Sequence, residues 1–199
     1  MNDPRSLQGA PDEGQTPLDP DEAAGLIPAW VATRGDLNEA EAANIRSASI
    51  WIRRQLKNDA PVASDGFLRG LHKAMFGKVW RWAGLYRNSE RNIGVAPHQI
   101  NMQLRQLFDD VAAWQEFGAY PSDEQAVRLH HRLTWIHPFP NGNGRTARVL
   151  VDCFLQQRGA EPFAWGRGIP ANEARGSYLA AIRLADAGDY TALMNFVRV

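Results

Sequence analysis

Apolar residues recur at helical spacing along most of the chain, and this pattern predicts a mostly α-helical protein. In the clearest stretch, Leu129 and Leu133 fall on one face of a helix that Pro138 ends, because proline disfavours helix at the residue before it. The spacing predicts helices over residues 36–57, 64–76, 97–114, 122–137, 145–157, 172–187 and 189–196. The helix over 145–157 is apolar on most sides, so we expect it at the centre of the fold.

Polar residues mark the start of two of these helices. Asp36 is the expected cap of the first, since a side-chain carboxylate can accept hydrogen bonds from the free N–H groups of the first turn. Ser122 and Gln125 have the spacing of a capping box, in which each side chain bonds the other residue's backbone.

Two regions depart from the helical pattern. Residues 80–95 contain few helical repeats and several Gly and Asn residues, so they predict a loop or a short β-hairpin. Residues 1–24 are rich in Pro, Gly and acidic side chains and poor in apolar ones, which predicts a mobile or extended arm. A segment that pairs with another chain is the alternative for this arm. The sequence therefore predicts one all-α domain over 25–199, with one short hairpin.

Composition narrows the class of protein. The chain has 199 residues, of which 44% are hydrophobic and 22% charged, as is typical of one globular domain. Its formal net charge of zero argues against a protein whose main ligand is nucleic acid. Cys153 is the sole cysteine and lies among apolar residues, so we expect a core residue in a cytoplasmic protein without disulfides. No apolar stretch is long enough to span a membrane, and the first residues do not have the pattern of a secretory signal.

The chemistry is concentrated in residues 137–148, which read HPFPNGNGRTAR. Gly142 and Gly144 directly precede a predicted helix, so their backbone N–H groups can converge on an anion. Arg145 and Arg148 lie on one face of the first turns, where cations oppose the helix dipole. A bound anion would compensate them, and arginine suits phosphate oxygens well.

His137 lies at the other edge of this loop and is a candidate general base. A lone histidine at a helix end is usually structural, but the adjacent phosphate loop favours the catalytic interpretation. His130 and His131 suggest a metal site as an alternative, although they point to different helix faces and no nearby carboxylate completes the set. Arg81, Arg87 and Arg91 lie in the segment predicted as a loop or hairpin, and they form either a basic rim for an acidic target or a solvated surface.

Residues 137–148 resemble the signature of the Fic (Fido) family, His-x-Phe-x-Asp/Glu-Gly-Asn-Gly-Arg-x-x-Arg. The resemblance extends upstream, because residues 82–87 and 92–97 resemble the loop and the β-hairpin flap of that family. The Asn-Ile-Gly-Val flap, the asparagine at 141 and residues 33–39 are most similar to the subfamily called mobile mystery protein B. The resemblance covers about residues 80–159 and implies the all-α Fic fold.

The resemblance also implies an activity and a set of roles. Fic proteins typically transfer AMP from ATP to a Ser, Thr or Tyr hydroxyl of a target protein, which makes ATP the expected donor. His137 would take the proton of the target hydroxyl, and Phe139 would anchor the loop in the core. The phosphates would be held by Gly142, Asn143, Gly144, Arg145 and Arg148. The target chain would bind along the flap by strand addition, at Asn92, Ile93, Gly94 and Val95.

Two positions depart from the family pattern. The acidic residue that helps to hold Mg²⁺ is replaced by Asn141, a neutral and therefore weaker ligand, which puts the expected Mg²⁺ in doubt. No match to the family's inhibitory helix motif occurs, but Glu39 or Glu41 could pair with Arg148 in its place. Solvated carboxylates at a helix start are the alternative for both glutamates.

We therefore expect a Fic-type adenylyltransferase with a nucleotide and a target protein as partners and no membrane partner. Family analogy adds a toxin role and an antitoxin or inhibitory partner. The alternative is a Fic-fold module that binds nucleotide or peptide without transfer, which the asparagine at 141 favours and His137 with both arginines opposes.

Overall fold

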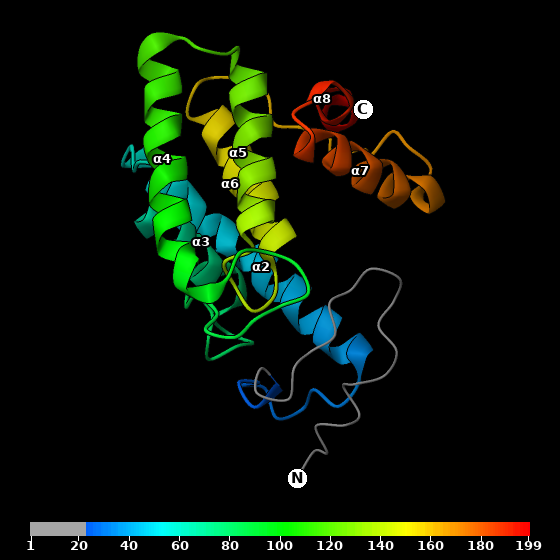
Figure 1. The fold of residues 1–199 in the computed structure, drawn as a ribbon. Coiled ribbons are helices and arrows are strands. Elements are labelled where there is room, and N and C mark those ends of the chain that lie inside the picture. Colours follow the sequence, from blue (N-terminus) through cyan, green and yellow to red (C-terminus); the bar gives the residue numbers. More distant parts are fainter. Residues whose placement is uncertain (1–22) are drawn as a thin grey trace.

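A computed structural model describes residues 23–199 of the chain. The expected arm over 1–24 lies almost wholly outside these residues, so its prediction stays open. Within the described range the chain forms a helical fold (Figure 1). Its helices are, in order, α2 (Arg34–Lys57), α3 (Asp65–Phe76), the short 3₁₀ helix η2 (Pro97–Gln99), α4 (Ile100–Phe117), α5 (Ser122–Ile136), α6 (Asn143–Gln156), α7 (Ala171–Asp186) and α8 (Thr191–Arg198).

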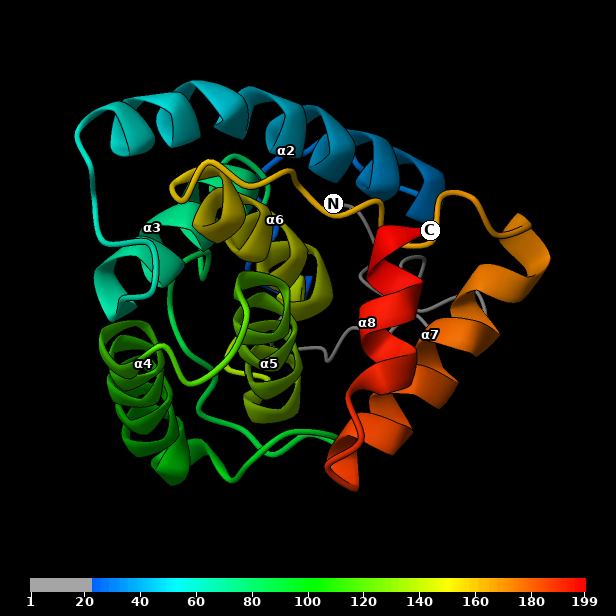
Figure 2. The ribbon, with the colours of Figure 1, turned by 90° about the horizontal axis from the view of Figure 1, so that it is seen from above.

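Helices α5 and α6 form the centre of the fold. Figure 2 shows α3 and α4 on one side of this pair, α7 and α8 on the other, and α2 across the top. Val151, Phe154 and Leu155 of α6 are fully buried, which confirms the prediction that this helix is central. The site loop between α5 and α6 is therefore attached at both ends to the most buried helices of the molecule.

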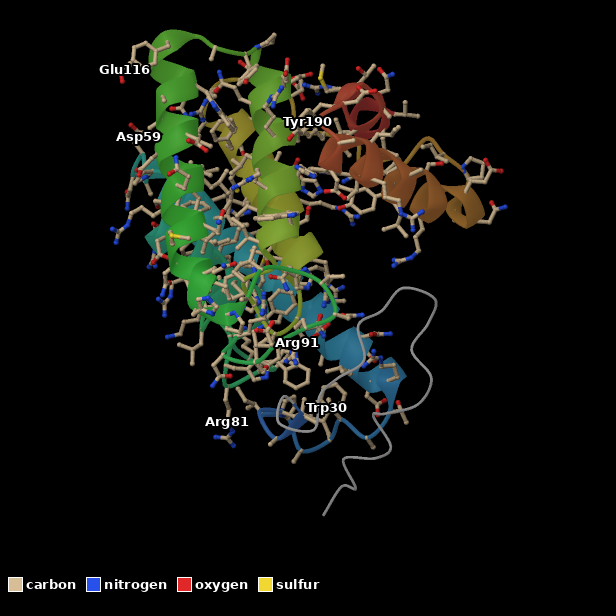
Figure 3. All side chains as sticks on the ribbon, viewed as in Figure 1. Trp30, Asp59, Arg81, Arg91, Glu116 and Tyr190 are labelled. Carbon is tan, nitrogen blue, oxygen red and sulfur yellow. The ribbon has the colours of Figure 1, made fainter. Side chains whose placement is uncertain are left out.

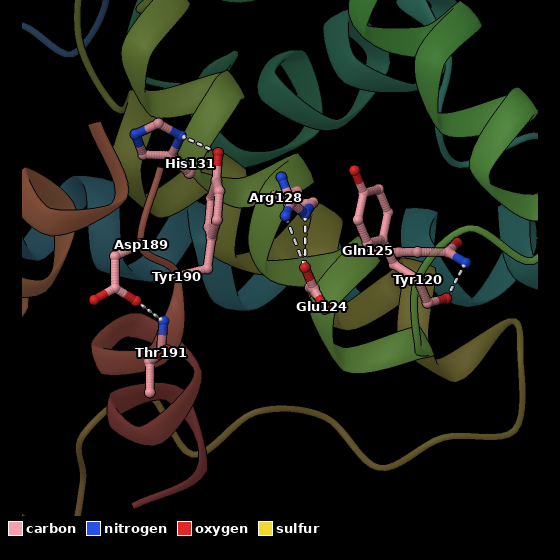
Figure 4. Close-up of polar contacts among 8 residues, drawn as sticks. All are labelled: Tyr120, Glu124, Gln125, Arg128, His131, Asp189, Tyr190 and Thr191. Atoms are coloured by element: carbon pink, nitrogen blue, oxygen red, sulfur yellow. Dashed lines mark hydrogen bonds and ion pairs between the residues drawn. The ribbon is translucent and has the colours of Figure 1, made fainter. Parts of the chain in front are cut away.

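The helix starts differ in part from the predicted caps. Thr33, not Asp36, is the N-cap of α2; the Asp36 carboxylate accepts from the Thr33 backbone N–H at 2.8 Å, and the two residues form a capping box. The capping box predicted at Ser122 is wrong, because α5 begins at that serine and Pro121 precedes it as N-cap. The Gln125 amide instead donates to the Tyr120 carbonyl at 2.8 Å (Figure 4).

The predicted β-hairpin is also wrong. Residues 81–96 form turns and irregular loop, and within the described chain the one isolated bridge joins Leu26 to Trp80. The reason is that, apart from local turns, backbone N–H groups of this segment bond to the end of α5 and the residues after it rather than across a hairpin. The Arg87 N–H donates to the Pro138 carbonyl at 2.9 Å, and the Val95 N–H donates to the Ile136 carbonyl at 3.3 Å. We keep the name flap for residues 92–95.

Helices α7 and α8 are fixed to α5 by polar and aromatic contacts. The His131 Nε2 lies 2.8 Å from an Asp186 oxygen of α7, and the Tyr190 hydroxyl lies 3.3 Å from His131 Nδ1 (Figure 4). The Arg128 guanidinium lies over the rings of Tyr120 and Tyr190, at 4.0 and 4.2 Å from their centroids. These contacts hold α7 as a wall beside the end of α5. Among the described residues, no helix has the length and apolar character needed to cross a membrane.

Candidate active site

One cavity of about 970 Å³ brings most of the predicted site residues together. Its walls come from α2, the flap, the end of α5, the loop before α6, the first turns of α6, and α7. The predicted residues that line it are Glu41, Ile93, Gly94, Val95, His137, Asn141, Gly142, Asn143, Gly144, Arg145 and Arg148. Asn92 and Glu39 are exposed and do not line it.

His137 is the C-cap of α5 and adopts the left-handed conformation, with φ 53° and ψ 58°. This turn ends the helix ahead of Pro138, and the imidazole lines the cavity. The flap packs directly against it at Gly94, where a Cβ atom would lie 2.6 Å from the Cβ of His137. Gly94 also has φ +97°, so only glycine allows the flap to approach the histidine this closely.

Burial lowers the pKa of His137 to about 4, and the nearby charges of Arg87 and Arg91 act in the same direction. A hydrogen bond to the Thr134 backbone raises the pKa, which means that the ring donates to that carbonyl. The imidazole is therefore neutral at pH 7, and its second nitrogen has a lone pair that can accept a proton.

The loop before α6 is shaped to hold an anion. Gly142 is the N-cap of α6 with φ +78°, and a Cβ there would lie 2.7 Å from the Phe76 ring. The helix begins at Asn143, two residues before the predicted start, so the backbone N–H groups of its first turn face the end of the cavity without helical partners. Partial positive charge at this end of the helix favours phosphate.

The Asn143 side chain stabilises this loop from within. Its oxygen accepts from the Phe139 N–H at 2.8 Å and its nitrogen donates to the Phe139 carbonyl at 2.8 Å. Both polar atoms of the amide are thus used on the loop backbone, and the residue is 5% exposed. The structure places Asn143 as a residue that orders the loop, whereas the sequence suggested a phosphate contact.

His72 of α3 is part of the site, although the sequence analysis did not select it. This fully buried ring lies 3.8 Å, centroid to centroid, from Phe139. Its Nδ1 accepts from the Gly84 N–H at 2.9 Å, so its Nε2 is the donor to the Asn141 carbonyl at 3.1 Å. Burial lowers its pKa to about 3, so the ring is neutral. The sequence signal that could have identified His72 is its place beside the apolar residues of α3, where a histidine would be buried.

Arg87 is buried, whereas the sequence suggested a surface residue. It is 4% exposed rather than part of a basic rim. Its guanidinium donates to the carbonyls of His137 at 2.7 Å and Ser89 at 3.0 Å, and to the carbonyl of Val95. Arg87 therefore joins the flap to the end of α5. Arg81, by contrast, is exposed and points away from the molecule (Figure 3).

Glu41 forms an ion pair with Arg145 at 2.5 Å, whereas the sequence suggested a pair with Arg148. Its other oxygen accepts from the Trp80 indole N–H at 2.7 Å, and its side chain is 6% exposed. Arg148 instead lies over the Tyr178 ring of α7, with 5.1 Å between the guanidinium carbon and the ring centroid. The two arginines of α6 thus face different walls of the cavity.

The residues at the loop do not fit a Mg²⁺ site of the family type. The Asn141 side-chain oxygen, a neutral ligand, accepts from the Gly142 N–H at 2.6 Å and so caps its own loop. Both oxygens of Glu41 are engaged by Arg145 and Trp80. Mg²⁺ in nucleotide sites is usually held by one or two carboxylates together with phosphates, and the loop supplies no carboxylate. No cluster of three metal-ligating side chains occurs among the described residues.

The remaining candidates have structural contacts. His130 is fully buried with its Nε2 3.0 Å from the Tyr178 hydroxyl, and His131 contacts Asp186 and Tyr190. Cys153 is buried, as predicted, and burial raises the pKa of its thiol to about 12. A thiol with so high a pKa is a poor nucleophile at neutral pH.

Comparison with known proteins agrees with this geometry. Residues 64–155 match the family model described as Fic/DOC family. The protein adenylyltransferase fic-1 of Caenorhabditis briggsae is 30% identical over 119 residues, which are 58% of this chain and 22% of that relative. The chain therefore spans about a fifth of the length of this curated relative.

Solved structures share the fold. Fic-1 (aa134–508) of C. elegans has a TM-score of 0.67 at 23% identity, covering 88% of this chain and 51% of that one. The BepC protein of Bartonella tribocorum, solved with bound AMPPNP, has a TM-score of 0.64 at 17% identity. The match covers 97% of this chain and 96% of the BepC chain. The family match and the loop at 137–148 lead to one conclusion: residues 64–155 of this chain form a domain of the Fic/DOC family, and the solved structures share its fold.

Proposed function

We propose that this chain is a protein adenylyltransferase that moves AMP from ATP to a Ser, Thr or Tyr hydroxyl of a target protein. The observation that carries the proposal is the position of His137 in the same cavity as the anion-binding loop, Arg145 and Arg148. Curated relatives named protein adenylyltransferase support the reaction class. The AMPPNP in the BepC structure supports a nucleotide as ligand of this fold.

In the proposed step, the target hydroxyl oxygen attacks the α-phosphorus of ATP. A bond forms between that oxygen and phosphorus, the α–β anhydride bond breaks, and pyrophosphate leaves. The hydroxyl proton passes to the free nitrogen of His137. A neutral imidazole is ready to accept it, and the negative charge of bound phosphates would raise the pKa of His137 from about 4 towards neutrality.

The loop and the arginines supply positioning and charge in this step. First-turn N–H groups after Gly142 would hold phosphate oxygens, with Arg145 and Arg148 from the side. Such prepositioned donors stabilise the charge that develops on the transferring group without reorganising during the reaction. Asn143, Phe139 and His72 act through the loop, which they hold in place.

The target chain is proposed to bind at the flap beside His137. Ile93 is 50% exposed and lines the cavity, and Trp135 of α5, 43% exposed, lines the same rim. An extended segment passing along these residues would present its hydroxyl to the imidazole. An antitoxin or inhibitory partner and a toxin role are proposals from family analogy. A cytoplasmic location is a proposal from the single cysteine, and membership of the mobile mystery protein B subfamily is a proposal from the resemblance of residues 33–39, 92–95 and 141.

A second candidate function is a module that binds nucleotide without transferring AMP. Asn141 favours it, because a neutral side chain bonded to the Gly142 N–H is a weaker Mg²⁺ ligand than the acidic residue of the family signature. One labelling assay distinguishes the two candidate functions. ATP labelled on the α-phosphate is incubated with the chain in cell lysate, with Mg²⁺, with Mn²⁺ and with chelator. We expect protein-bound label with the native chain and a loss of about a hundredfold to ten-thousandfold with His137→Ala. Absence of label under all three conditions, with nucleotide binding intact, would favour the binding module.

A further inference from the structure

Four arginines from three helices line the cavity, two more than the loop signature accounts for. Besides Arg145 and Arg148 of α6, they are Arg34 at the start of α2 and Arg175 of α7. The cavity lining holds two carboxylates, Glu41 and Asp186. Each of them already contacts a neighbour, Arg145 and His131 respectively. The lining therefore has an excess of two positive charges when histidines are neutral.

Two of these arginines lie where a helix disfavours cations. Arg34 is the first residue of α2 and Arg145 is the third residue of α6. Positive charge in a first turn opposes the helix dipole, so a bound anion would stabilise both helix starts. Two helix N-termini that face one cavity, each with an arginine in its first turn, indicate a ligand with several negative charges.

The loop side of this cavity lacks the carboxylate that usually helps to hold a phosphate-bound Mg²⁺. Asn141 replaces the acidic residue of the family signature, and its oxygen is turned onto the Gly142 N–H. Glu41 lines the same cavity, but both of its oxygens already accept hydrogen bonds, one from Trp80 and one from Arg145. Without a carboxylate ligand, the charge of the phosphates has to be balanced by other groups. Arginine is well suited to this, since it is always charged and binds phosphate with two donors at once.

We propose that the cavity binds its nucleoside polyphosphate without Mg²⁺, with Arg34 and Arg175 supplying the charge that the metal supplies in relatives with an acidic residue in the loop. This inference rests on the proposed function for the presence of a nucleotide. Arg145 and Arg148 hold the phosphates nearest the loop. Arg34 and Arg175 line the cavity from two other helices, α2 and α7.

The test is equilibrium binding of the non-hydrolysable analogue AMPPNP to the full chain by calorimetry. It is measured once with excess Mg²⁺ and once with EDTA. We expect dissociation constants within about threefold of each other. Affinity at least tenfold weaker in EDTA would overturn the inference and leave the proposed function standing. Absence of binding in both buffers would overturn both.

Variants assign the effect to the arginines. Arg34→Gln and Arg175→Gln should each weaken AMPPNP binding in EDTA by about tenfold, the size expected for one charge-assisted contact. Arg46→Gln and Arg183→Gln are matched controls, because these arginines are exposed on the same two helices and do not line the cavity. Equal affinity of test and control variants would overturn the role of Arg34 and Arg175.

A converse variant restores the family residue. Asn141→Asp adds a negative charge and a hard ligand beside the phosphates. We expect weaker binding in EDTA than for the native chain and at least tenfold stronger binding on addition of Mg²⁺. Native-like affinity of this variant in both buffers would mean that residue 141 does not face the phosphates, and would overturn the explanation offered for the missing metal. Thermal unfolding of each variant verifies that it is folded.

Discussion

The two sides of the cavity are held in different ways. On the loop side, buried side chains bond the backbone. The Asn143 amide bonds both the N–H and the carbonyl of Phe139, and His72 donates to the Asn141 carbonyl. Arg87 donates to carbonyls of the flap and of His137 at the end of α5. On the arginine side, the groups are partly exposed, and the Arg145 side chain is 40% exposed in its pair with Glu41. The loop side is thus held by contacts within the protein, whereas the proposed nucleotide would complete the arginine side.

This comparison predicts that changes on the loop side cost folding stability, and that changes on the arginine side cost ligand affinity. The largest effect should come from Arg87. Arg87→Met removes the donors of several buried carbonyls, so we expect a loss of about 2–5 kcal/mol in the free energy of unfolding. Denaturant unfolding measures it, with exposed Arg81→Met as control. A loss below 1 kcal/mol would show that the flap does not depend on this arginine.

The arginine side should respond in the opposite way. Arg148→Ala removes a charged phosphate contact from a half-buried position, so nucleotide affinity should fall about tenfold to a hundredfold. Stability should change by less than about 1 kcal/mol. Calorimetric titration measures the affinity, and Arg105→Ala on the exposed face of α4 is the control. Unchanged affinity would remove Arg148 from the nucleotide site.

His72 makes the loop side sensitive to acid. Burial holds the pKa of His72 near 3 in the folded chain, well below the 6.5 of a free histidine. As the pH falls below 6.5, His72 is therefore protonated in the unfolded chain while it is still neutral in the folded one. Stability from this residue is complete above pH 6.5 and declines as the pH falls towards 3, by about 2 kcal/mol between pH 7 and pH 5. His72→Gln should reduce that decline by the same amount, whereas exposed His98→Gln should not. Equal pH dependence in both variants would contradict this assignment.

The smallest effect is expected from the pair between Glu41 and Arg145. Glu41→Gln keeps an acceptor for the Trp80 indole but removes the charge that holds Arg145. If this pair restrains the site, nucleotide affinity should rise by a few fold, and self-modification should increase with it. Glu39→Gln on the exposed side of α2 is the control. A fall in affinity would mean that Glu41 orients Arg145 for the ligand.

The comparison also explains which parts of the site could be predicted from the sequence. The candidate loop, its histidine and its two arginines lie within twelve consecutive residues, so local spacing was enough to group them, and the structure places them around one cavity. Phe139 and Gly142 have local roles that follow from the same spacing. The helix pattern likewise predicted α2 to α8 to within a few residues, since amphipathic spacing is a local property.

What the sequence could not supply were contacts between distant segments. Arg87 reads as a surface cation because nothing nearby in sequence reveals the carbonyls of Ser89, Val95 and His137 gathered around it. The missing hairpin has a similar cause, because backbone N–H groups of Arg87 and Val95 bond to carbonyls at and after the end of α5. Similarly, the partner of Glu41 depends on how α2 crosses α6, and helix spacing does not determine a crossing.

The central claim is that binding and proton transfer are divided between different groups, with the loop and arginines binding the nucleotide and His137 acting as base. The most direct test is the affinity of His137→Ala for AMPPNP, compared with the native chain in the same buffer. We predict dissociation constants within about threefold, because the backbone N–H groups and arginines are unchanged. Loss of binding by tenfold or more in a folded variant would contradict the claim, since His137 would then be a ligand contact.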